Sequence, residues 1–249
     1  MIPYRAIRSN IEFAAKVLPQ ICNTSRVVSM LPTAHMYGLM FEVLYELSAG
    51  SHVFFLSRLP SPKIIMQALS EVKPTLVVAV PLIIEKIYKS KVKPVIEKAG
   101  MRFAMRLPGL EQVIMNKIKT ELINAFGGEF IEVIIGGAAF NKEVEAFFKR
   151  MEFPFTVGYG MTECAPIITY DDYKTAKLYS CGRIVPNMEM KIDSPDPQNV
   201  AGELLVRGAN VFLGYFKNEE ATKEVLDADG WLHTGDMGVI DADGYLFLR

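Results

Sequence analysis

The sequence predicts an α/β protein: a layered α/β/α unit with a mostly parallel sheet, followed by a small distorted β-barrel subdomain. Two observations support this fold class. In the first two thirds of the 249 residues, continuous apolar runs alternate with helix-like segments, which is typical of parallel strands buried on both faces. In the last third, short strands alternate with turns, as in a small antiparallel unit.

Four apolar runs rich in Val, Ile and Phe are predicted to form the parallel strands. They read RVVSML (26–31), HVFFLS (52–57), TLVVAV (75–80) and FIEVIIG (130–136). None alternates with polar residues in the way that a half-exposed strand does, so we expect both faces of this sheet to be covered. The longest apolar stretch of the chain, TLVVAVPLII, is too short to span a bilayer.

The segments between these runs carry residues that favour helix ends. Gly50 is suited to end a helix, because glycine tolerates the left-handed conformation found there. Ser61 and Asn141 are suited to N-cap positions, and a proline follows Ser61 in the first turn. We therefore expect helices over 37–50, 61–72 and 141–151.

The last third has a different pattern from Gly182 onward. Its short strands read MEMKID, GELLVRG and DGYLFLR, and turn residues separate them. One helix is expected over 218–226, with Asn218 as its cap. We accordingly predict an α/β subdomain over 1–170 and a β-barrel-like subdomain over 171–249.

Charge and cysteine content argue against several classes of protein. The net charge is −1, so no bulk positive field favours binding to nucleic acid. The histidines are far apart, and the cysteines lack the spacing of a structural zinc site or a disulfide framework. The start of the chain also lacks the apolar core of a signal peptide. We therefore expect a cytoplasmic protein, with its cysteines reduced, at Cys22, Cys164 and Cys181.

One basic segment, residues 86–119, interrupts the α/β rhythm. It contains nine lysines and arginines against two glutamates, with apolar residues interleaved. One interpretation is a helical insert that contacts the inner face of a membrane or acidic groups. The other is a solvated helical flank whose lysines lie along apolar surface. The second is favoured, because no clean amphipathic period covers the segment.

Three predicted turns carry residues that could bind a ligand or take part in catalysis. In IIGGAAF, Gly136 and Gly137 follow a strand and leave room for a flat ring or a phosphate near the backbone; the alternative is a simple tight turn. In VGYGMTEC, Tyr159 could stack on a nucleobase, Thr162 could donate to an oxygen, and Glu163 could bind Mg²⁺. The alternative there is a core tyrosine followed by a surface turn, and the residues alone do not decide.

The third turn, WLHTGDMG, places Asp236 between small residues. A carboxylate there could accept hydrogen bonds from two neighbouring hydroxyls, as a ribose presents them. The alternative is an aspartate in an ordinary β-turn, which is common.

The order and spacing of these motifs are more specific than any one of them. A strand followed by GGA, then YGMTE, GELLVRG with GYF, W-x-x-TGD and DGYL resembles the AMP-forming acyl-adenylating superfamily, the AMP-binding enzymes. The motif LPTAHMYG, the basic insert and ECAPIITY are most similar to bacterial long-chain fatty acid–CoA ligases.

The resemblance implies a nucleotide site. Gly136, Gly137 and Ala138 would line the edge where adenine and the acyl group meet. Tyr159 would stack on adenine, and Gly160 would belong to the same nucleotide-binding turn.

It also implies residues that act on the reacting groups. Thr162 would hold the α-phosphate region, Glu163 would bind Mg²⁺, and Asp236 would take both ribose hydroxyls. His35 would border the acyl channel or help to place the carboxylate; the alternative is a residue at a helix entry, satisfied by backbone groups.

The implied substrates are a fatty acid, ATP and coenzyme A, with AMP as a product and Mg²⁺ as the metal. The family's phosphate loop, hinge and C-terminal domain have no counterpart in the 249 residues. The expectation is therefore a central piece of a ligase that binds nucleotide weakly and does not turn over alone. Two alternatives are an enzyme that activates an aryl or amino acid, and a nucleotide-binding module without catalysis.

Overall fold

The computed structural model of the protein describes residues 1–107 and 109–249. Its parallel layer has strands in the order β2, β1, β3, β4, β5, in which all pairs are parallel and one bridge between Val27 and Leu76 joins β1 to β3. The strands are β1 (Arg26–Ser29), β2 (His52–Phe55), β3 (Val77–Ala79), β4 (Val133–Ile135) and β5 (Phe155–Val157). The predicted parallel sheet is therefore confirmed, although each strand is shorter than its apolar run.

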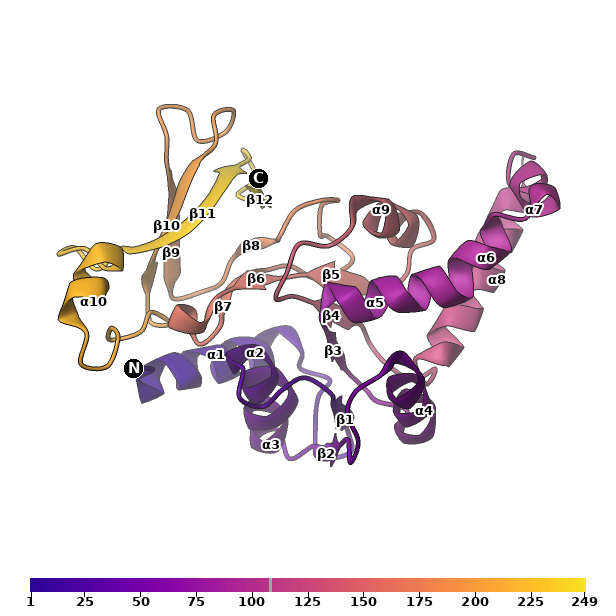
Figure 1. Cartoon of the computed structure of the whole chain (residues 1–249), viewed down its shortest axis with the longest axis horizontal. Coiled ribbons are helices and arrows are strands. Elements are labelled where there is room, and N and C mark those ends of the chain that lie inside the picture. Colours follow the sequence, from indigo (N-terminus) through magenta and orange to yellow (C-terminus); the bar gives the residue numbers. More distant parts are fainter. Residues whose placement is uncertain (108) are drawn as a thin grey trace.

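Helical segments alternate with these strands (Figure 1). They comprise α1 (Tyr4–Val17), α2 (Met36–Gly38), the π-helical η1 (Leu39–Leu44), α3 (Tyr45–Ser48), α4 (Pro62–Val72), α5 (Pro81–Ile87), the π-helical η2 (Tyr88–Val92), α6 (Lys93–Ile96), α7 (Ala99–Ala104), α8 (Leu110–Ala125) and α9 (Lys142–Arg150).

The predicted cap residues start and end helices as expected. The Ser61 hydroxyl accepts a hydrogen bond from the Ile64 amide of α4 at 3.3 Å. The Asn141 side chain accepts from two amides of the first turn of α9. Gly50, with φ of +77°, lies just beyond the end of α3. Because a residue with a side chain is strained in that conformation, glycine is the residue suited to this chain reversal.

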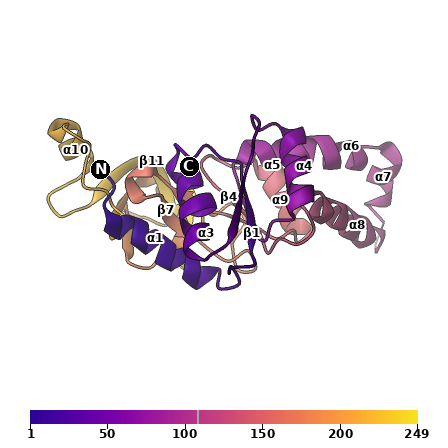
Figure 2. The ribbon, with the colours of Figure 1, turned by 90° about the horizontal axis from the view of Figure 1, so that it is seen from below.

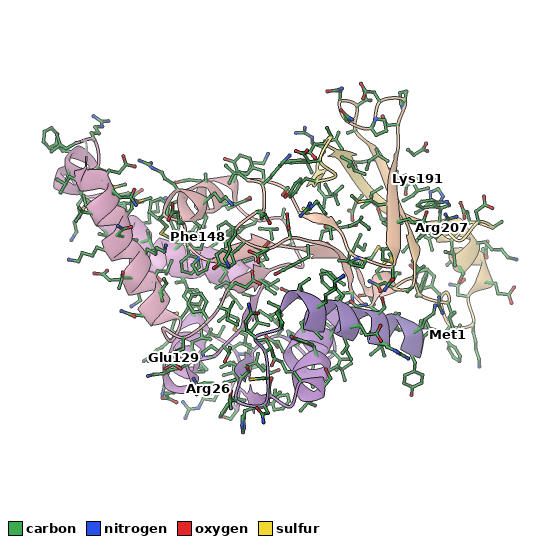
Figure 3. All side chains as sticks on the ribbon, turned by 180° about the vertical axis from the view of Figure 1, so that it is seen from behind. Met1, Arg26, Glu129, Phe148, Lys191 and Arg207 are labelled. Carbon is green, nitrogen blue, oxygen red and sulfur yellow. The ribbon has the colours of Figure 1, made fainter. Side chains whose placement is uncertain are left out.

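The sheet separates two hydrophobic cores. Val77 and Val133 point to a core that they share with α4, α5, α8 and α9. Val78 and Ile134, one residue further along their strands, point to the other core, which α1, η1 and the antiparallel strands complete. This period of two, with both faces apolar, is why the runs lack polar residues. Figure 3 shows Phe148 of α9 in the first core, where it is fully buried.

The last third forms the predicted antiparallel unit. Its four-stranded sheet has the order β12, β11, β10, β9, and α10 packs against it. A second small sheet of β6, β7 and β8 lies between this unit and the parallel layer. The elements are β6 (Tyr159–Gly160), η3 (Thr162–Cys164), β7 (Ile167–Tyr170), β8 (Arg183–Ile184), β9 (Met188–Asp193), β10 (Gly202–Gly208), α10 (Glu219–Val225), β11 (Leu232–Ile240) and β12 (Leu246–Leu248). The subdomain boundary after residue 170 stays a prediction; β7 and β8 pair across it.

The basic insert is helical in its described part, from η2 through α8. Met115, Ile118 and Leu122 of α8 are buried in the first core, so one face of this helix is structural. Figures 1 and 2 show α7 at one end of the elongated molecule, opposite α10. Residue 108 lies outside the described residues. Membrane contact through the segment 86–119 stays a prediction. In the described residues, no helix has the length and apolar character needed to cross a membrane.

Candidate functional site

The three turns singled out in the sequence border one cleft of about 440 Å³. Gly137 and Ala138 come from the turn after β4, Tyr159 and Gly160 form β6 after β5, and Asp236 lies within β11. Both parallel strands contribute the residues that follow their carboxyl ends, because those ends meet at one edge of the sheet. The structure thus brings five of the predicted nucleotide-binding residues together.

A direct hydrogen bond joins the second turn to the third. The Tyr159 hydroxyl donates to Asp236 Oδ2 at 2.5 Å. Burial of the phenol and the bond to Asp236 both raise the pKa of Tyr159 above its usual range, so the phenol is a neutral donor at physiological pH. Asp236 itself is exposed, which leaves carboxylate surface open to the cleft.

Asp236 lies within strand β11 and not in the predicted turn, at a point where the pairing of β11 with β10 is irregular. Glu203 of β10, a residue that sequence reasoning missed, holds this part of β11. One Glu203 oxygen accepts from the Gly235 amide at 3.0 Å, and the other lies 2.9 Å from His233 Nδ1. The Thr234 hydroxyl donates to the Leu204 carbonyl at 2.8 Å. The sequence alone could not mark Glu203, because its position depends on the register of β10 against β11, in which Glu203 pairs with Met237.

The glycines of the first two turns have different reasons to be glycine. Gly137 adopts φ of +85°, a conformation in which side chains are strained. A Cβ on Gly136 would lie 3.2 Å from the Tyr37 ring, so Gly136 faces an adjacent pocket rather than the cleft. A Cβ on Gly160 would lie 2.2 Å from the Pro166 carbonyl oxygen, so this glycine is needed for the close approach of β6 and β7.

Thr162 and Glu163 lie in η3, just beyond the cleft. Thr162 is exposed, and Glu163 Oε1 accepts a hydrogen bond from the Tyr215 hydroxyl at 2.9 Å. Buried Asn10 of α1 holds this turn: its side-chain oxygen accepts from the Ile167 amide at 3.0 Å. Neither Thr162 nor Glu163 borders the cleft directly, so their roles toward a ligand stay predictions.

Glu163 alone provides the predicted metal ligand. No group of three or more His, Cys, Asp or Glu side chains suited to a metal ion occurs in the described part of the chain. Mg²⁺ is commonly held by one or two carboxylates together with phosphate oxygens and water. Partly exposed Glu163, with only one oxygen engaged by Tyr215, fits that mode of binding and not an all-protein cage.

His35 lies outside both cavities that flank the β6 turn. It is exposed at the start of α2, and its backbone amide donates to the Pro32 carbonyl. Tyr37, two residues later, does border the adjacent pocket. The predicted role of His35 near the acyl group therefore stays a prediction.

The adjacent pocket is mainly apolar and only about 60 Å³ in volume. Its walls include Tyr37 and Phe41 from the α2–η1 segment and Val78 and Ile134 from the sheet. The Tyr37 hydroxyl donates to the Ile134 carbonyl at 3.0 Å, which fixes the ring across the pocket. Sequence reasoning did not find this pocket, because its wall residues look like ordinary core.

The cleft and the pocket meet at the second turn. Gly158, Tyr159 and Gly160 border both cavities. A polar ligand in the cleft and an apolar ligand in the pocket would therefore be in contact beside the β6 backbone. Lys142 of α9 also borders the cleft and supplies a cation there, a residue that the sequence motifs did not indicate.

Comparison with known sequences identifies relatives over most of the chain. The model of the family described as "AMP-binding enzyme" matches residues 1–216. The long-chain-fatty-acid–CoA ligase ACSBG2 of Gallus gallus is 30% identical over 244 residues, covering 89% of this chain and 32% of that protein. The 4-coumarate–CoA ligase 5 of Oryza sativa subsp. japonica is 28% identical, covering 89% of this chain and 38% of that protein. The chain spans about a third of the length of these curated relatives.

Solved structures share the fold. ATP-bound MatB from Rhodopseudomonas palustris superposes with a TM-score of 0.76 at 21% identity, over 100% of this chain and 44% of that one. The o-succinylbenzoate coenzyme A synthetase MenE of Bacillus subtilis, in complex with ATP and a magnesium ion, gives 0.74 at 22% identity, over 99% and 46%. These likenesses confirm the predicted fold class.

Proposed function

This chain belongs to the AMP-binding enzyme family, and on that premise we propose that it takes part in ATP-dependent activation of a carboxylic acid and transfer of the acyl group to coenzyme A. We propose a fatty acid as the acid. The similarity to a long-chain-fatty-acid–CoA ligase and the apolar pocket support this choice. An aryl acid is the alternative, which the similarity to a 4-coumarate–CoA ligase supports.

The observation that carries the proposal is the cleft that contains the Tyr159–Asp236 hydrogen bond and adjoins an apolar pocket. Adenosine binding calls for an aromatic face for the base and an acceptor for the ribose hydroxyls. Tyr159 and Asp236 would supply these groups, and the two side chains are hydrogen-bonded to each other. An acid needs an apolar cavity that ends near the phosphate. The β6 turn provides the contact between the two cavities.

In the proposed first step, the acid's carboxylate oxygen attacks the α-phosphorus of ATP. A P–O bond forms, the bond between the α- and β-phosphates breaks, and pyrophosphate leaves. Tyr159 and Asp236 fix the nucleoside, so the α-phosphate is placed relative to the carboxylate. Lys142, which borders the cleft, offsets phosphate charge. In the second step, the thiol sulfur of coenzyme A attacks the acyl carbon, AMP leaves, and the thiol proton passes to solvent.

Mg²⁺ would be held by Glu163 and by phosphate oxygens, and it would neutralise charge on the leaving pyrophosphate. The Tyr215 hydroxyl orients the carboxylate by donating to Oε1. Thr162, exposed in the same turn, would donate to the α-phosphate region, and Gly137 and Ala138 leave room for the adenine edge.

The test is carboxylate-dependent pyrophosphate release with a panel of fatty, aryl and amino acids, followed by detection of the acyl-adenylate. It is run on the chain and on any longer polypeptide that carries it. We expect release with fatty acids that exceeds release with the other acids. Pyrophosphate release with aryl acids alone would show that the substrate is an aryl acid and not a fatty acid. Tight AMP binding without release by any acid in either polypeptide would leave only a nucleotide-binding module.

A further inference from the structure

The apolar pocket ends at a wall that also borders a second hollow. Phe13 and Val17 of α1 and Tyr170 at the end of β7 border both cavities. The second hollow is open and about 870 Å³, against about 60 Å³ for the pocket. The two spaces are thus separated by three side chains, one of which is small and two of which are aromatic rings.

The two rings form a specific contact. The ring centroids of Phe13 and Tyr170 lie 5.7 Å apart with an interplanar angle of 79°, an edge-to-face arrangement. The Tyr170 hydroxyl donates to Glu132 Oε1 at 2.6 Å. Glu132 precedes β4 and is only 2% exposed, so Tyr170 is anchored from inside the protein. Phe13 is only partly buried and has no polar group to anchor it.

The apolar pocket is too small for a long acyl chain. An engineered protein cavity of about 150 Å³ takes one benzene molecule, and the present pocket has less than half that volume. A longer acyl chain therefore needs space beyond the wall. On the other side, the hollow has a mixed lining of apolar and charged residues, in which Ile184, Val185 and Met190 supply apolar surface. Figure 1 shows α1, the element that carries Phe13, running beneath β7.

We infer that the Phe13–Tyr170 pair limits the length of the acid that this site accepts. Acids that end at the pair bind with the wall closed. A longer acid displaces the Phe13 ring, and its end enters the second hollow, while Tyr170 stays in place through Glu132. Phe13 is then a specificity-determining residue, and Glu132 positions Tyr170. This inference rests on the proposed function, since it assigns the pocket to the acid.

The test is displacement of a fluorescent fatty acid from the chain by saturated acids from hexanoate to octadecanoate. Each methylene that becomes buried adds about 0.8 kcal/mol, or roughly a four-fold gain in affinity. For the unmodified chain, we expect the gain to stop at a particular length. For Phe13→Ala, we expect the gain to continue for at least about two more carbons, so that the longest acids bind roughly ten-fold tighter than to the unmodified chain.

Phe54→Ala is the matched control, because Phe54 is 43% exposed on β2 and borders none of these cavities. Phe13→Leu, which keeps apolar bulk, replaces the alanine variant if that variant does not fold. Tyr170→Phe keeps the ring but loses the Glu132 bond, and we expect the length limit to become less sharp.

The outcomes separate the inference from the function. A length limit in Phe13→Ala that equals that of the unmodified chain overturns the inference alone, and so does an equal shift in Phe54→Ala. Failure of every acid to displace the probe from the unmodified chain overturns both the inference and the fatty acid assignment.

Discussion

The cleft and the apolar pocket share one turn, yet they are built from different kinds of residue. The cleft is formed by the ends of strands and the residues that follow them, and Gly137, Ala138 and Asp236 are exposed. The pocket is formed by strand and helix residues that also belong to the second hydrophobic core, such as Val78 and Phe41. A change in the cleft should therefore alter binding with little effect on folding, whereas a change around the pocket should alter stability as well.

Buried acid groups strengthen this contrast. Glu42 of η1 follows Phe41, which lines the pocket, and is fully buried. Its Oε2 accepts from the amides of Met30 and Leu31 and from the Ser29 hydroxyl, while Oε1 has no partner within the described residues. Burial raises the pKa of Glu42 to about 8, despite the three hydrogen bonds that favour its charged form. The core beside the pocket thus contains a buried carboxyl group with a raised pKa.

The largest effect is expected at the cleft. Asp236→Ala removes the acceptor for the ribose hydroxyls, and hydrogen bonds to a charged group contribute about 1.5–3 kcal/mol. We expect AMP to bind about 10- to 100-fold more weakly, by calorimetry. Asp193→Ala is the control, because Asp193 is an exposed residue at the end of β9. Equal AMP affinity in the two variants would remove Asp236 from the ribose site.

The next largest effect is expected for Glu42, in the core beside the pocket. Because the pKa of folded Glu42 lies above that of an unfolded glutamate, the folded protein binds a proton more tightly. The contribution of Glu42 to the free energy of unfolding is therefore fully present at low pH and is lost as pH rises toward about 8. Glu42→Gln should flatten this decline by about 1.4 kcal/mol or more, the free energy of one pKa unit.

Denaturant unfolding at several pH values measures the effect of Glu42→Gln. Exposed Glu71→Gln on α4 is the control and should keep the slope of the unmodified chain. AMP affinity should be the same in all three proteins at neutral pH. A pH slope unaltered by Glu42→Gln would mean that this carboxylate is not a source of the decline.

The smallest effect is expected at the edge of the cleft. Glu163→Gln keeps the hydrogen bond from Tyr215 but removes the charge that would attract Mg²⁺. A partly exposed charge pair contributes about 0.5–1 kcal/mol. The Mg²⁺ concentration for half-maximal ATP binding should therefore rise about two- to five-fold. Glu220→Gln, exposed on α10, should leave it unchanged, and a superimposable Mg²⁺ titration for Glu163→Gln would exclude that residue as a ligand.

The same contrast explains what could be predicted from the sequence. Ser61, Asn141 and Gly50 mark helix ends because local backbone chemistry requires such residues there. Tyr159 and Asp236 stand out because the order and spacing of their motifs, YGMTE and TGD, are specific, although each residue alone also fits a structural role. The parallel sheet was also predicted, from the continuous apolar runs.

The pocket could not be predicted in this way. Phe13, Phe41 and Val78 are ordinary apolar residues at helix and strand positions, and only their packing leaves a space between them. Glu203 was missed for a related reason, since its action depends on the register of β10 against β11. The π-helical turns η1 and η2 likewise arise from tertiary packing, which sequence periodicity does not encode.

The hydrogen bond between Tyr159 and Asp236 spans 77 positions and connects the small β6–β8 sheet to the β9–β12 sheet. Any motion that draws β11 away from β6 must break it. A nucleoside held by both residues would act as a tether between the two sheets. Occupancy of the cleft and the mutual orientation of these sheets are therefore thermodynamically linked, so that a ligand which tightens one also restricts the other.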